Sequence, residues 1–370
     1  MVAGEEDQAR PFPAQSEMTG QVQSGGTAAV REAHRFDEAA LARWMEAHVA
    51  GFAGPLTVEQ FKGGQSNPTY KLITPAKSYV MRRKPPGKLL PGAHAVEREV
   101  KVLTALERVN FPVAHVYGLC TDESVIGTWF YVMDMVEGRI FWDATIPDVS
   151  RAERAALYDA MNETIARLHT TDYAAIGLGD FGKPGNYFAR QIGRWSKQYL
   201  DDTEAGRDPN LDKLAEWLPA HTPAGDETTL VHGDFRIDNM IFHPTEPRIL
   251  AVIDWELATL GHPLADFSYH LMTYRLPPLV IAGLVGADLA ALNIPSEDAY
   301  VAAYCHRTGR DRIDHLDFYI AYNLFRLGAI IHGIKGRMLR GTAASPNARE
   351  MVAALPVIAE LGWQQAARSR

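Results

Sequence analysis

Cysteine is nearly absent from this sequence of 370 residues. The chain has 2 cysteines, Cys120 and Cys305, which stand far apart, and no Cys-x-x-Cys pair occurs. A disulfide framework and a cysteine-based zinc site are therefore excluded, and the composition is typical of a protein from a reducing compartment.

The sequence also lacks a long hydrophobic run. Its most apolar stretch, residues 279–294, is interrupted by Gly283, Gly286 and Asp288 and is too short to cross a membrane. Positions 5–7 are acidic, where a secretory signal would carry positive charge before an apolar segment. We therefore expect a cytoplasmic protein with no membrane-bound segment.

Positive charge is in deficit, because 37 Lys and Arg residues stand against 45 Asp and Glu residues, a net charge of −8. A general nucleic-acid binder would have the opposite balance, so we expect no nucleic-acid partner. Hydrophobic residues make up 46% of the chain and charged residues 22%, which is enough to build a core and excludes a disordered chain. The length favours one large two-lobed unit or two domains.

Local patterns divide the chain into a tail and two lobes. Residues 1–30 are rich in Gly, Gln, Ser, Ala and Pro without apolar periodicity, and we predict a flexible tail there. Residues 31–134 predict a small lobe with helices near 37–50 and 93–109 and five short strands at 56–61, 69–73, 78–83, 116–120 and 129–133. Residues 135–370 are mostly helical in pattern, with a small β insert between 230 and 253 and long helices near 149–170 and 316–339. The expected fold class is α+β.

The strongest chemical signal is the polar run His232-Gly-Asp-Phe-Arg-Ile-Asp-Asn239, followed by Asp254-Trp-Glu256. The run lies between two apolar, strand-like segments, and Asp254 ends a third, so these polar groups can converge at neighbouring strand ends. Phosphoryl transfer needs such a point, with a carboxylate near the attacking hydroxyl and with an amide and a second carboxylate to hold Mg²⁺. The pattern therefore favours a phosphotransferase.

With these motifs in this order, the sequence resembles the aminoglycoside phosphotransferase family, whose members share the two-lobed fold of protein kinases. It is most similar to the branch found beside or fused to acyl-CoA dehydrogenases. The resemblance implies a kinase-like fold with a five-stranded antiparallel sheet in the small lobe. It also implies that Asp234 is the catalytic residue and that Asn239 and Asp254 are the Mg²⁺ ligands. Arg236 falls where protein kinases have a phosphate-contacting Lys and is ranked as a catalytic helper, whereas His232 is expected to brace the loop.

The resemblance places the ATP site in the small lobe, and we predict ATP and Mg²⁺ as cofactors. Arg82 ends the third strand where kinases have the phosphate-binding Lys, and Glu99, near the buried stripe of the next helix, is its expected partner. A glycine turn between the first two strands would approach the triphosphate, although such a turn is usually only a hairpin. Its residues are Gly63, Gly64, Gln65, Ser66 and Asn67. The hinge that would line the adenine site contains Met133, Met135 and Val136.

The sequence departs from the family pattern at two positions. Arg82 replaces Lys, but an Arg can still grip two phosphate oxygens at once. His262 replaces the first Asp of a Gly-Asp-Pro-x-x-Asp segment, which leaves the role of that segment open. Asp266, its last residue, is expected to cap a helix or to anchor the catalytic loop through hydrogen bonds.

A local reversal of charge bears on the acceptor. Residues 318–349 contain no Asp or Glu, yet they include Arg326, Lys335, Arg337, Arg340 and Arg349. Such a stretch is either a helix end favoured by cations or a patch for an anionic substrate, such as the phosphates of coenzyme A. The branch is also similar to enzymes that phosphorylate hydroxyacyl-CoA thioesters. We therefore predict a hydroxyacyl-CoA acceptor bound by Arg326, Arg337 and Arg340, with a pathway link to an acyl-CoA dehydrogenase.

Other functions stay open. The same chemistry could act on the hydroxyl of an aminoglycoside, choline, homoserine or a similar small molecule. A nucleotide-binding pseudokinase is a second alternative, favoured only by Arg82 in place of Lys. A metal hydrolase would need a set of closely spaced His or carboxylate ligands, which the isolated His232 does not supply.

Overall fold

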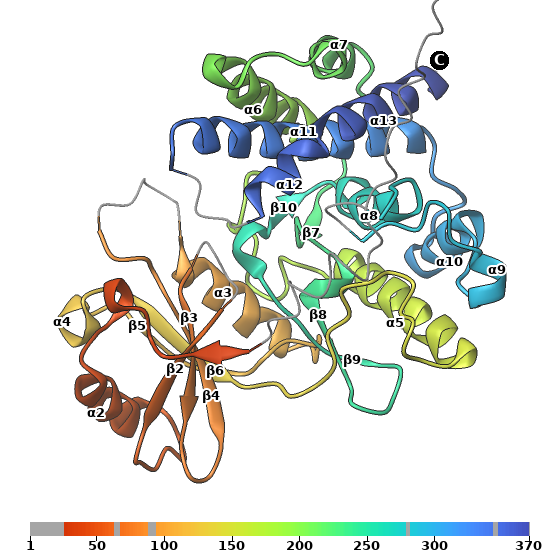
Figure 1. The fold of residues 1–370 in the computed structure, drawn as a ribbon. Helices are drawn as coiled ribbons and strands as arrows, with labels where there is room; N and C mark the ends of the chain where they lie inside the picture. Colours follow the sequence, from red (N-terminus) through yellow and green to blue (C-terminus); the bar gives the residue numbers. More distant parts are fainter. Residues whose placement is uncertain (1–25, 63–66, 88–93, 279–281, 343–346, 370) are drawn as a thin grey trace, which may run out of the picture.

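The chain folds into a small lobe and a larger helical lobe, which lie side by side in a computed structural model (Figure 1). The structure describes residues 26–62, 67–87, 94–278, 282–342 and 347–369. Within these ranges, no helix combines the length and the apolar character that a membrane crossing requires. The α+β fold class expected from the sequence is confirmed, with a sheet in the small lobe and mostly helices in the large lobe.

The small lobe is built on an antiparallel sheet with the strand order β1-β2-β3-β4-β6-β5. Its strands are β1 (Thr27–Ala28), β2 (Thr57–Phe61), β3 (Thr69–Ile73), β4 (Ser78–Arg83), β5 (Val116–Cys120) and β6 (Phe130–Asp134). The sheet therefore has 6 strands and not the five predicted. The additional strand β1 lies inside the segment predicted as a tail, where Thr27 pairs with Phe61. Two residues are too few to show the alternating pattern of a strand, so the sequence does not predict β1. The strand forms because the edge of β2 offers backbone groups for pairing.

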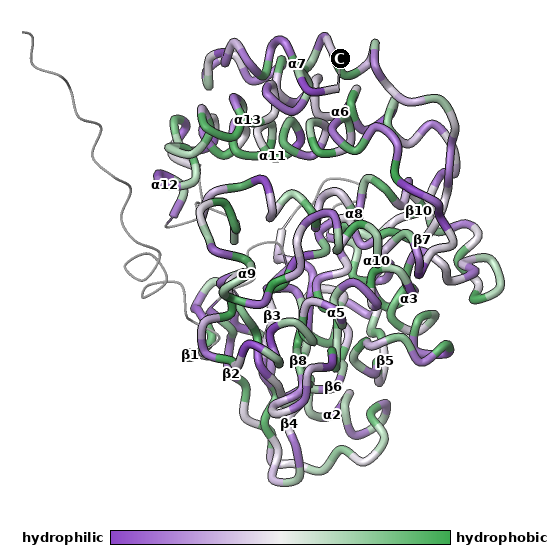
Figure 2. The backbone as a smooth tube through the Cα atoms, turned by 90° about the vertical axis from the view of Figure 1, so that its right-hand side faces the viewer, coloured by the Kyte–Doolittle hydropathy of each residue, from purple (hydrophilic) through white to green (hydrophobic). Residues whose placement is uncertain are grey.

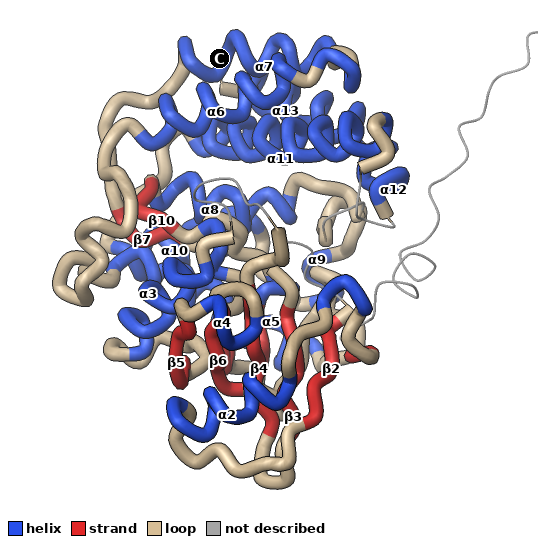
Figure 3. Tube along the Cα trace, turned by 90° about the vertical axis from the view of Figure 1, so that its left-hand side faces the viewer, coloured by secondary structure: helices blue, strands red, loops and turns tan. Residues whose placement is uncertain are grey.

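Helices cover both faces of this sheet. On one face, α2 (Glu38–His48) and α4 (Glu123–Ile126) pack against alternate strand residues such as Leu72, Met81 and Val132 (Figure 3). On the other face, α3 (Val96–Glu107) packs beside Tyr131, which belongs to the core of the large lobe. Because successive strand residues point to opposite faces, the sheet separates two cores. The helix that carries Glu99 therefore lies on the face toward the large lobe.

The large lobe is organised around α11 (Leu316–Leu339), a helix of 24 residues with most of its residues buried. Figure 2 shows hydrophobic residues along much of this helix, which packs against α6, α7, α8 and α13. The helices of the lobe are α5 (Arg151–Thr170), α6 (Tyr187–Asp201), α7 (Pro209–Ala220), α8 (Pro263–Leu271), α9 (Leu289–Leu292), α10 (Glu297–Thr308), α11, α12 (Ala348–Ala353) and α13 (Leu355–Arg368). A helix buried on nearly all sides is typical of the centre of a large helical core.

Two short antiparallel pairs hold the polar segments of the large lobe. The first joins β7 (Thr229–Val231) to β10 (Thr259–Gly261), and the second joins β8 (Met240–Phe242) to β9 (Ile249–Val252). The predicted β insert is thus present, and the polar run 232–239 connects β7 to β8. Asp254 follows β9 after one residue, Ile253, so both polar segments emerge from the ends of these short strands.

The link between the lobes is tied to the large lobe at Arg139. Its backbone N–H and C=O exchange hydrogen bonds with Phe242 of β8, both 2.8 Å. Gly138 lies so close to the Phe242 carbonyl that any side chain there would overlap with it. At the other end of the link, the Asp134 N–H donates to the His115 carbonyl at 2.9 Å. The connecting segment is therefore anchored on both sides.

Candidate active site

Residues 232–239, the predicted catalytic loop, close on themselves through Asn239. Its side-chain N–H donates to the Asp234 backbone carbonyl at 2.9 Å and to the Asp234 carboxylate at 3.0 Å. A short 3₁₀ turn, Ile237–Asn239, brings the two residues together, because it folds the chain back after Arg236. With its amide nitrogen used in this way, Asn239 keeps its side-chain oxygen as an acceptor or a metal ligand.

Positive charge surrounds the carboxylate of Asp234. The Arg236 guanidinium lies 3.2 Å from Asp234 and 3.1 Å from Asp238. Burial raises the pKa of Asp234, but Arg236, a hydrogen bond from Tyr269 and the more distant Arg326 together hold it below its ordinary value. Asp234 is therefore a carboxylate at neutral pH and can accept a proton.

Tyr269 was not identified from the sequence. It lies on α8 three positions after Asp266, on the same side of the helix, and its hydroxyl lies near the Asp234 carboxylate. Burial, reinforced by the nearby Asp234 carboxylate, raises the pKa of Tyr269, which keeps the hydroxyl protonated as a donor. The spacing from Asp266 was the only signal in the sequence that could have pointed to this residue.

The backbone of the loop is held by His232 and Asp266. The Asp266 carboxylate accepts from the His232 N–H at 2.7 Å and from the Gly233 N–H at 2.8 Å, and it is buried. Nδ1 of His232 accepts from the Asp234 N–H, and its Nε2–H donates to the Ile253 carbonyl at 3.0 Å. His232 thus braces the loop, as expected, and Asp266 anchors it through hydrogen bonds.

His262 takes the position of an N-cap. Its Nδ1 accepts from the Leu264 N–H at 3.2 Å, at the start of α8, and the residue is buried. Only a neutral imidazole can accept in this way, and the positive end of the helix dipole disfavours a charged ring. Burial lowers the pKa of His262 to about 4. The imidazole therefore performs the capping that an Asp would perform, without introducing a charge.

This arrangement predicts a specific acid sensitivity. In the unfolded chain His262 protonates near pH 6.5, whereas the folded protein resists protonation down to about 4. The unfolded state thus binds more protons between these pH values, and folding stability falls by up to about 3 kcal/mol as the pH decreases. We expect His262→Asn to retain the cap and to reduce this loss, measured as urea unfolding at pH 7 and pH 4.5. Equal losses in wild type and variant would contradict the prediction, and exposed His306→Asn is the matched control.

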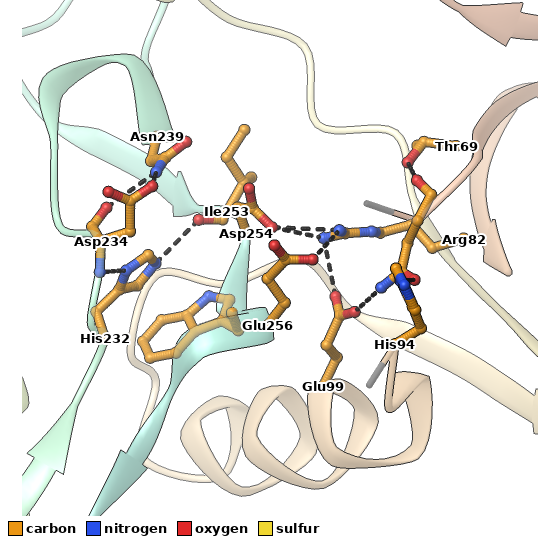
Figure 4. Close-up of polar contacts among 12 residues, drawn as sticks. Thr69, Arg82, His94, Glu99, His232, Asp234, Asn239, Ile253, Asp254 and Glu256 are labelled. Atoms are coloured by element: carbon orange, nitrogen blue, oxygen red, sulfur yellow. Dashed lines mark hydrogen bonds and ion pairs between the residues drawn. The ribbon is translucent and has the colours of Figure 1, made fainter. Parts of the chain in front are cut away.

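Arg82 joins the two lobes at the site. Its guanidinium lies 2.8 Å from Glu99 on α3, 3.2 Å from Asp254 and 3.8 Å from Glu256 (Figure 4). The predicted Arg82–Glu99 pair is therefore present, with Glu99 buried and not on the surface. Burial works against the charge, but Tyr131 and the three carboxylates raise the pKa of Arg82, so it stays a cation.

Glu99 is further fixed by neutral donors. Asn67 donates its side-chain N–H at 2.9 Å and Tyr131 donates its hydroxyl at 2.9 Å. Asn67 is wholly buried, so this residue of the predicted glycine turn orients the glutamate. The other four residues of the turn, Gly63, Gly64, Gln65 and Ser66, lie outside the described residues.

The predicted hinge residues lie at the end of β6 and just after it. Met133, Met135 and Val136 are all half-buried, and Met133 pairs with Val80 of β4 in the sheet. Their partial exposure is compatible with lining a ligand site beside the link, which stays a prediction.

The basic residues of α11 do not form the single patch expected from the sequence. Arg326 is 7% exposed and donates to the Gly233 carbonyl at 2.7 Å, so it faces the catalytic loop and not the solvent. Arg340 is paired with Asp202 at 2.8 Å and with Glu204 at 3.3 Å, so its charge is neutralised. Arg337 is exposed. The sequence could not reveal Asp202 and Glu204, because they come from the distant connection after α6.

The site offers hard oxygen ligands for a divalent cation. In the part of the chain that the structure describes, no cluster of three or more His, Cys, Asp or Glu residues has a metal-binding arrangement. Mg²⁺ usually takes only one or two protein ligands besides phosphate oxygens and water, so Asn239 and Asp254 fit that ion. Asp254 has a left-handed backbone with φ of 66°, which is uncommon outside glycine and directs its carboxylate toward Arg82.

A two-lobed fold with an Arg–Glu pair beneath the sheet and an Asp–Asn loop facing it is typical of a phosphotransferase. Comparison with known proteins supports this class. The profile of the phosphotransferase enzyme family (APH) matches residues 57–314. The chain belongs to this family.

Two curated relatives are named as members of the acyl-CoA dehydrogenase family. Acyl-CoA dehydrogenase family member 11 from chicken is 43% identical over 353 residues, which cover 93% of this chain and 45% of the relative. Member 10 of the same family from mouse is 43% identical over 317 residues, which cover 85% of this chain and 30% of the relative. The chain thus spans less than half the length of these curated relatives.

Solved structures agree on the fold. A protein from Ralstonia eutropha, named as a candidate aminoglycoside phosphotransferase, is 52% identical with a TM-score of 0.83, over 90% of this chain and 99% of that one. Choline kinase from Cryptosporidium parvum, 11% identical, aligns with a TM-score of 0.59 over 90% of this chain and 95% of that one. The second likeness shows the kinase-like fold alone.

Proposed function

We propose that the protein is an ATP- and Mg²⁺-dependent kinase that transfers the γ-phosphate to a hydroxyl of a hydroxyacyl-CoA. The observation that carries the chemistry is the contact of Arg82 with Glu99 and Asp254. These residues come from three distant segments, and each was expected at the site for a different reason. Their meeting supports one phosphate- and metal-binding point between the lobes.

Asp234 is the residue that orients the acceptor hydroxyl and takes its proton. Its lowered pKa favours the carboxylate that this role needs. Arg236, next to Asp234, supplies positive charge where the transferred phosphoryl group would develop negative charge. Transfer is directly from ATP to the acceptor, without a covalent intermediate on the enzyme.

The remaining residues would bind the nucleotide and the metal ion. Asn239 and Asp254 would hold Mg²⁺, which neutralises charge on the phosphates when bound. Arg82 would contact the phosphates while Glu99 orients it, as in its present pair. The turn 63–67 would cover the triphosphate, and Met133, Met135 and Val136 would line the adenine site.

A hydroxyacyl-CoA acceptor is supported by the names of the relatives and by the exposed cation Arg337 on the last turn of α11. The relatives combine a segment like this chain with the name of an acyl-CoA dehydrogenase, so a pathway link to such an enzyme follows from the proposal. A phosphorylated hydroxyacyl-CoA carries a leaving group that a later elimination step can remove. We place the reaction in the cytoplasm.

Purified protein with Mg²⁺ and ATP should be tested against a panel of hydroxyacyl-CoAs and a panel of aminoglycosides, choline and homoserine. We expect ADP release and a mass gain of one phosphate on an acyl-CoA. A product on the second panel would retain the kinase chemistry and overturn the acceptor. ATP binding without turnover on either panel would favour a pseudokinase.

Charge reversal at Arg337 tests the binding of the CoA phosphates. The side chain is exposed on the last turn of α11, and an exposed contact with a charge is worth up to about 1 kcal/mol. We therefore expect Arg337→Glu to raise the KM for the acyl-CoA about fivefold and to leave the KM for ATP unchanged. Exposed Arg312→Glu is the matched control. An unchanged KM for the acyl-CoA would remove Arg337 from the acceptor site.

A further inference from the structure

Arg326 is a buried cation, so it cannot bind a phosphate group at the protein surface. It lies in the middle of α11, is 7% exposed, and donates from Nη2 to the Gly233 carbonyl at 2.7 Å. Its guanidinium also lies over the ring of Tyr269, 4.9 Å from the centroid, and 5.8 Å from the centroid of Trp195. Burying a charge is costly unless its partners compensate, so this placement needs an explanation.

Gly233, the residue that Arg326 contacts, has little conformational freedom. It has φ of 84°, which favours glycine, and a Cβ there would lie 2.8 Å from the Leu257 carbonyl. Its N–H is held by Asp266 at 2.8 Å, and its C=O is held by Arg326 at 2.7 Å. Buried groups of opposite charge thus fix the residue directly before Asp234 from both sides.

The helix that carries Arg326 is itself locked to the helix that carries Asp266. Asn323, one turn earlier on α11, donates to the Ala265 carbonyl at 2.9 Å and to the Ser268 hydroxyl at 2.8 Å, and it is wholly buried. Both contacts lie on α8, beside Asp266. The two groups that hold Gly233 therefore sit on a rigid pair of helices.

Tyr269 gives Arg326 a second connection to Asp234. The guanidinium covers the face of the ring, while the hydroxyl of the same ring lies near the Asp234 carboxylate and interacts with its charge. A cation over an aromatic face is stabilising and restricts the ring to one orientation. Arg326 thus acts on Asp234 by two routes, through the backbone of Gly233 and through the side chain of Tyr269.

We propose that Arg326 is a positioning residue, which sets the orientation of the Asp234 carboxylate by holding the Gly233 carbonyl and the Tyr269 ring. The inference rests on the proposed function, because it takes Asp234 as the catalytic residue. Arg326 itself touches neither nucleotide nor acceptor. Its loss should slow the transfer step and leave substrate binding intact, because a small displacement of a reacting group has a large effect on rate.

Three variants at this position separate positioning from general folding. Arg326→Met keeps the apolar volume and removes the hydrogen-bond donor and the charge. Arg326→Gln has a donor without the charge, and Arg326→Lys has both a donor and the charge on a shorter side chain. Steady-state kinetics should be measured with ATP and the acceptor that turns over fastest, and also with water as acceptor. Melting temperatures and ADP affinities should be measured for the same proteins, with exposed Arg312→Gln as the matched control.

We expect Arg326→Met to lower kcat by about 10²-fold, with the KM for ATP, the KM for the acceptor and the ADP affinity within about twofold of wild type. The kcat of Arg326→Lys should be at least about tenfold higher than that of Arg326→Met. If Arg326→Met does not fold, a lowered kcat with normal ADP affinity in Arg326→Lys supports the inference. A normal kcat in the folded Met variant, or in the Gln variant where Met does not fold, would overturn it, as would losses in kcat that are matched by rises in both KM values.

The failure of the proposed function would look different. A wild-type protein that binds ATP and transfers phosphate to no acceptor and not to water would refute the kinase, and the inference with it. Transfer to an aminoglycoside in place of an acyl-CoA would change only the acceptor, and the Arg326 variants would be measured on that substrate.

Discussion

Replacing Asp234 with Asn is expected to lower kcat by about 10²–10⁴-fold, because the amide cannot accept the proton of the acceptor hydroxyl. The substitution keeps the shape of the side chain, and its remaining oxygen can still accept from Asn239, which now donates to the carboxylate at 3.0 Å. The loop should therefore keep its fold. The affinity for ATP should stay close to that of wild type, since the role proposed for Asp234 is with the acceptor hydroxyl and not with the nucleotide.

Single-turnover phosphotransfer and a separate measurement of ADP affinity check this expectation. The matched control is Asp298→Asn, an exposed carboxylate in the first turn of α10. A variant with near-normal kcat would show that Asp234 is not the catalytic residue. Loss of nucleotide affinity together with kcat would indicate that Asp234 belongs to the metal site.

Replacing Asp266 with Ala is expected to reduce the free energy of unfolding by about 3–5 kcal/mol. Asp266 is 3% exposed, and its carboxylate accepts from the N–H groups of His232 and Gly233. The Nε2 atom of His169 lies 3.3 Å from the same carboxylate. Removal of the carboxylate leaves two buried backbone donors without their acceptor, which costs more than the hydrogen bonds themselves contribute. Because the same contacts orient the catalytic loop, activity should fall as well.

The same substitution should change how stability depends on pH. Burial raises the pKa of Asp266, but hydrogen bonding and charge from His169, together with the contact to His232, hold it below its ordinary value. A carboxylate with a lowered pKa stabilises the fold above its unfolded pKa, and this contribution disappears as the pH falls through the folded value. The difference in the free energy of urea unfolding between wild type and Asp266→Ala should therefore be largest near pH 7 and should shrink as the pH falls below 3.8, the ordinary pKa of an aspartate. A constant difference would contradict this account, and Asp298→Ala controls for a general loss of negative charge.

The sequence predicted well those helices and strands whose residues show a clear hydrophobic period. The helix expected at 316–339 and the strands expected at 69–73, 78–83 and 116–120 have those bounds in the structure. Alternating apolar residues and the helical period report which side of an element is buried, whatever lies against it. The strand β1 escaped because Thr27 and Ala28 acquire their structure only from the edge of β2.

The same contrast between local pattern and long-range contacts applies to the residues of the candidate site. Asp234, Asn239 and Asp254 could be predicted because they belong to one local sequence pattern, and Glu99 could be predicted because helical geometry places it beside a buried stripe. Arg326 and Arg340 were misplaced, since their surroundings depend on Gly233 and Asp202, far away in sequence. Charge along the chain shows how many cations a segment carries, but it does not show which of them are already neutralised.

The link between the lobes has a mechanical consequence. Asp134 is fixed to the sheet and Arg139 to β8 by backbone hydrogen bonds, so a rotation of one lobe against the other is absorbed by the torsion angles of the short segment between them. That segment leaves the sheet from β6, next to the edge strand β5. In a rigid rotation, displacement grows with distance from the pivot. In such a rotation the strands β2 and β3, which precede and follow residues 63–66, would move further than β6, because they lie further from the link in the sheet.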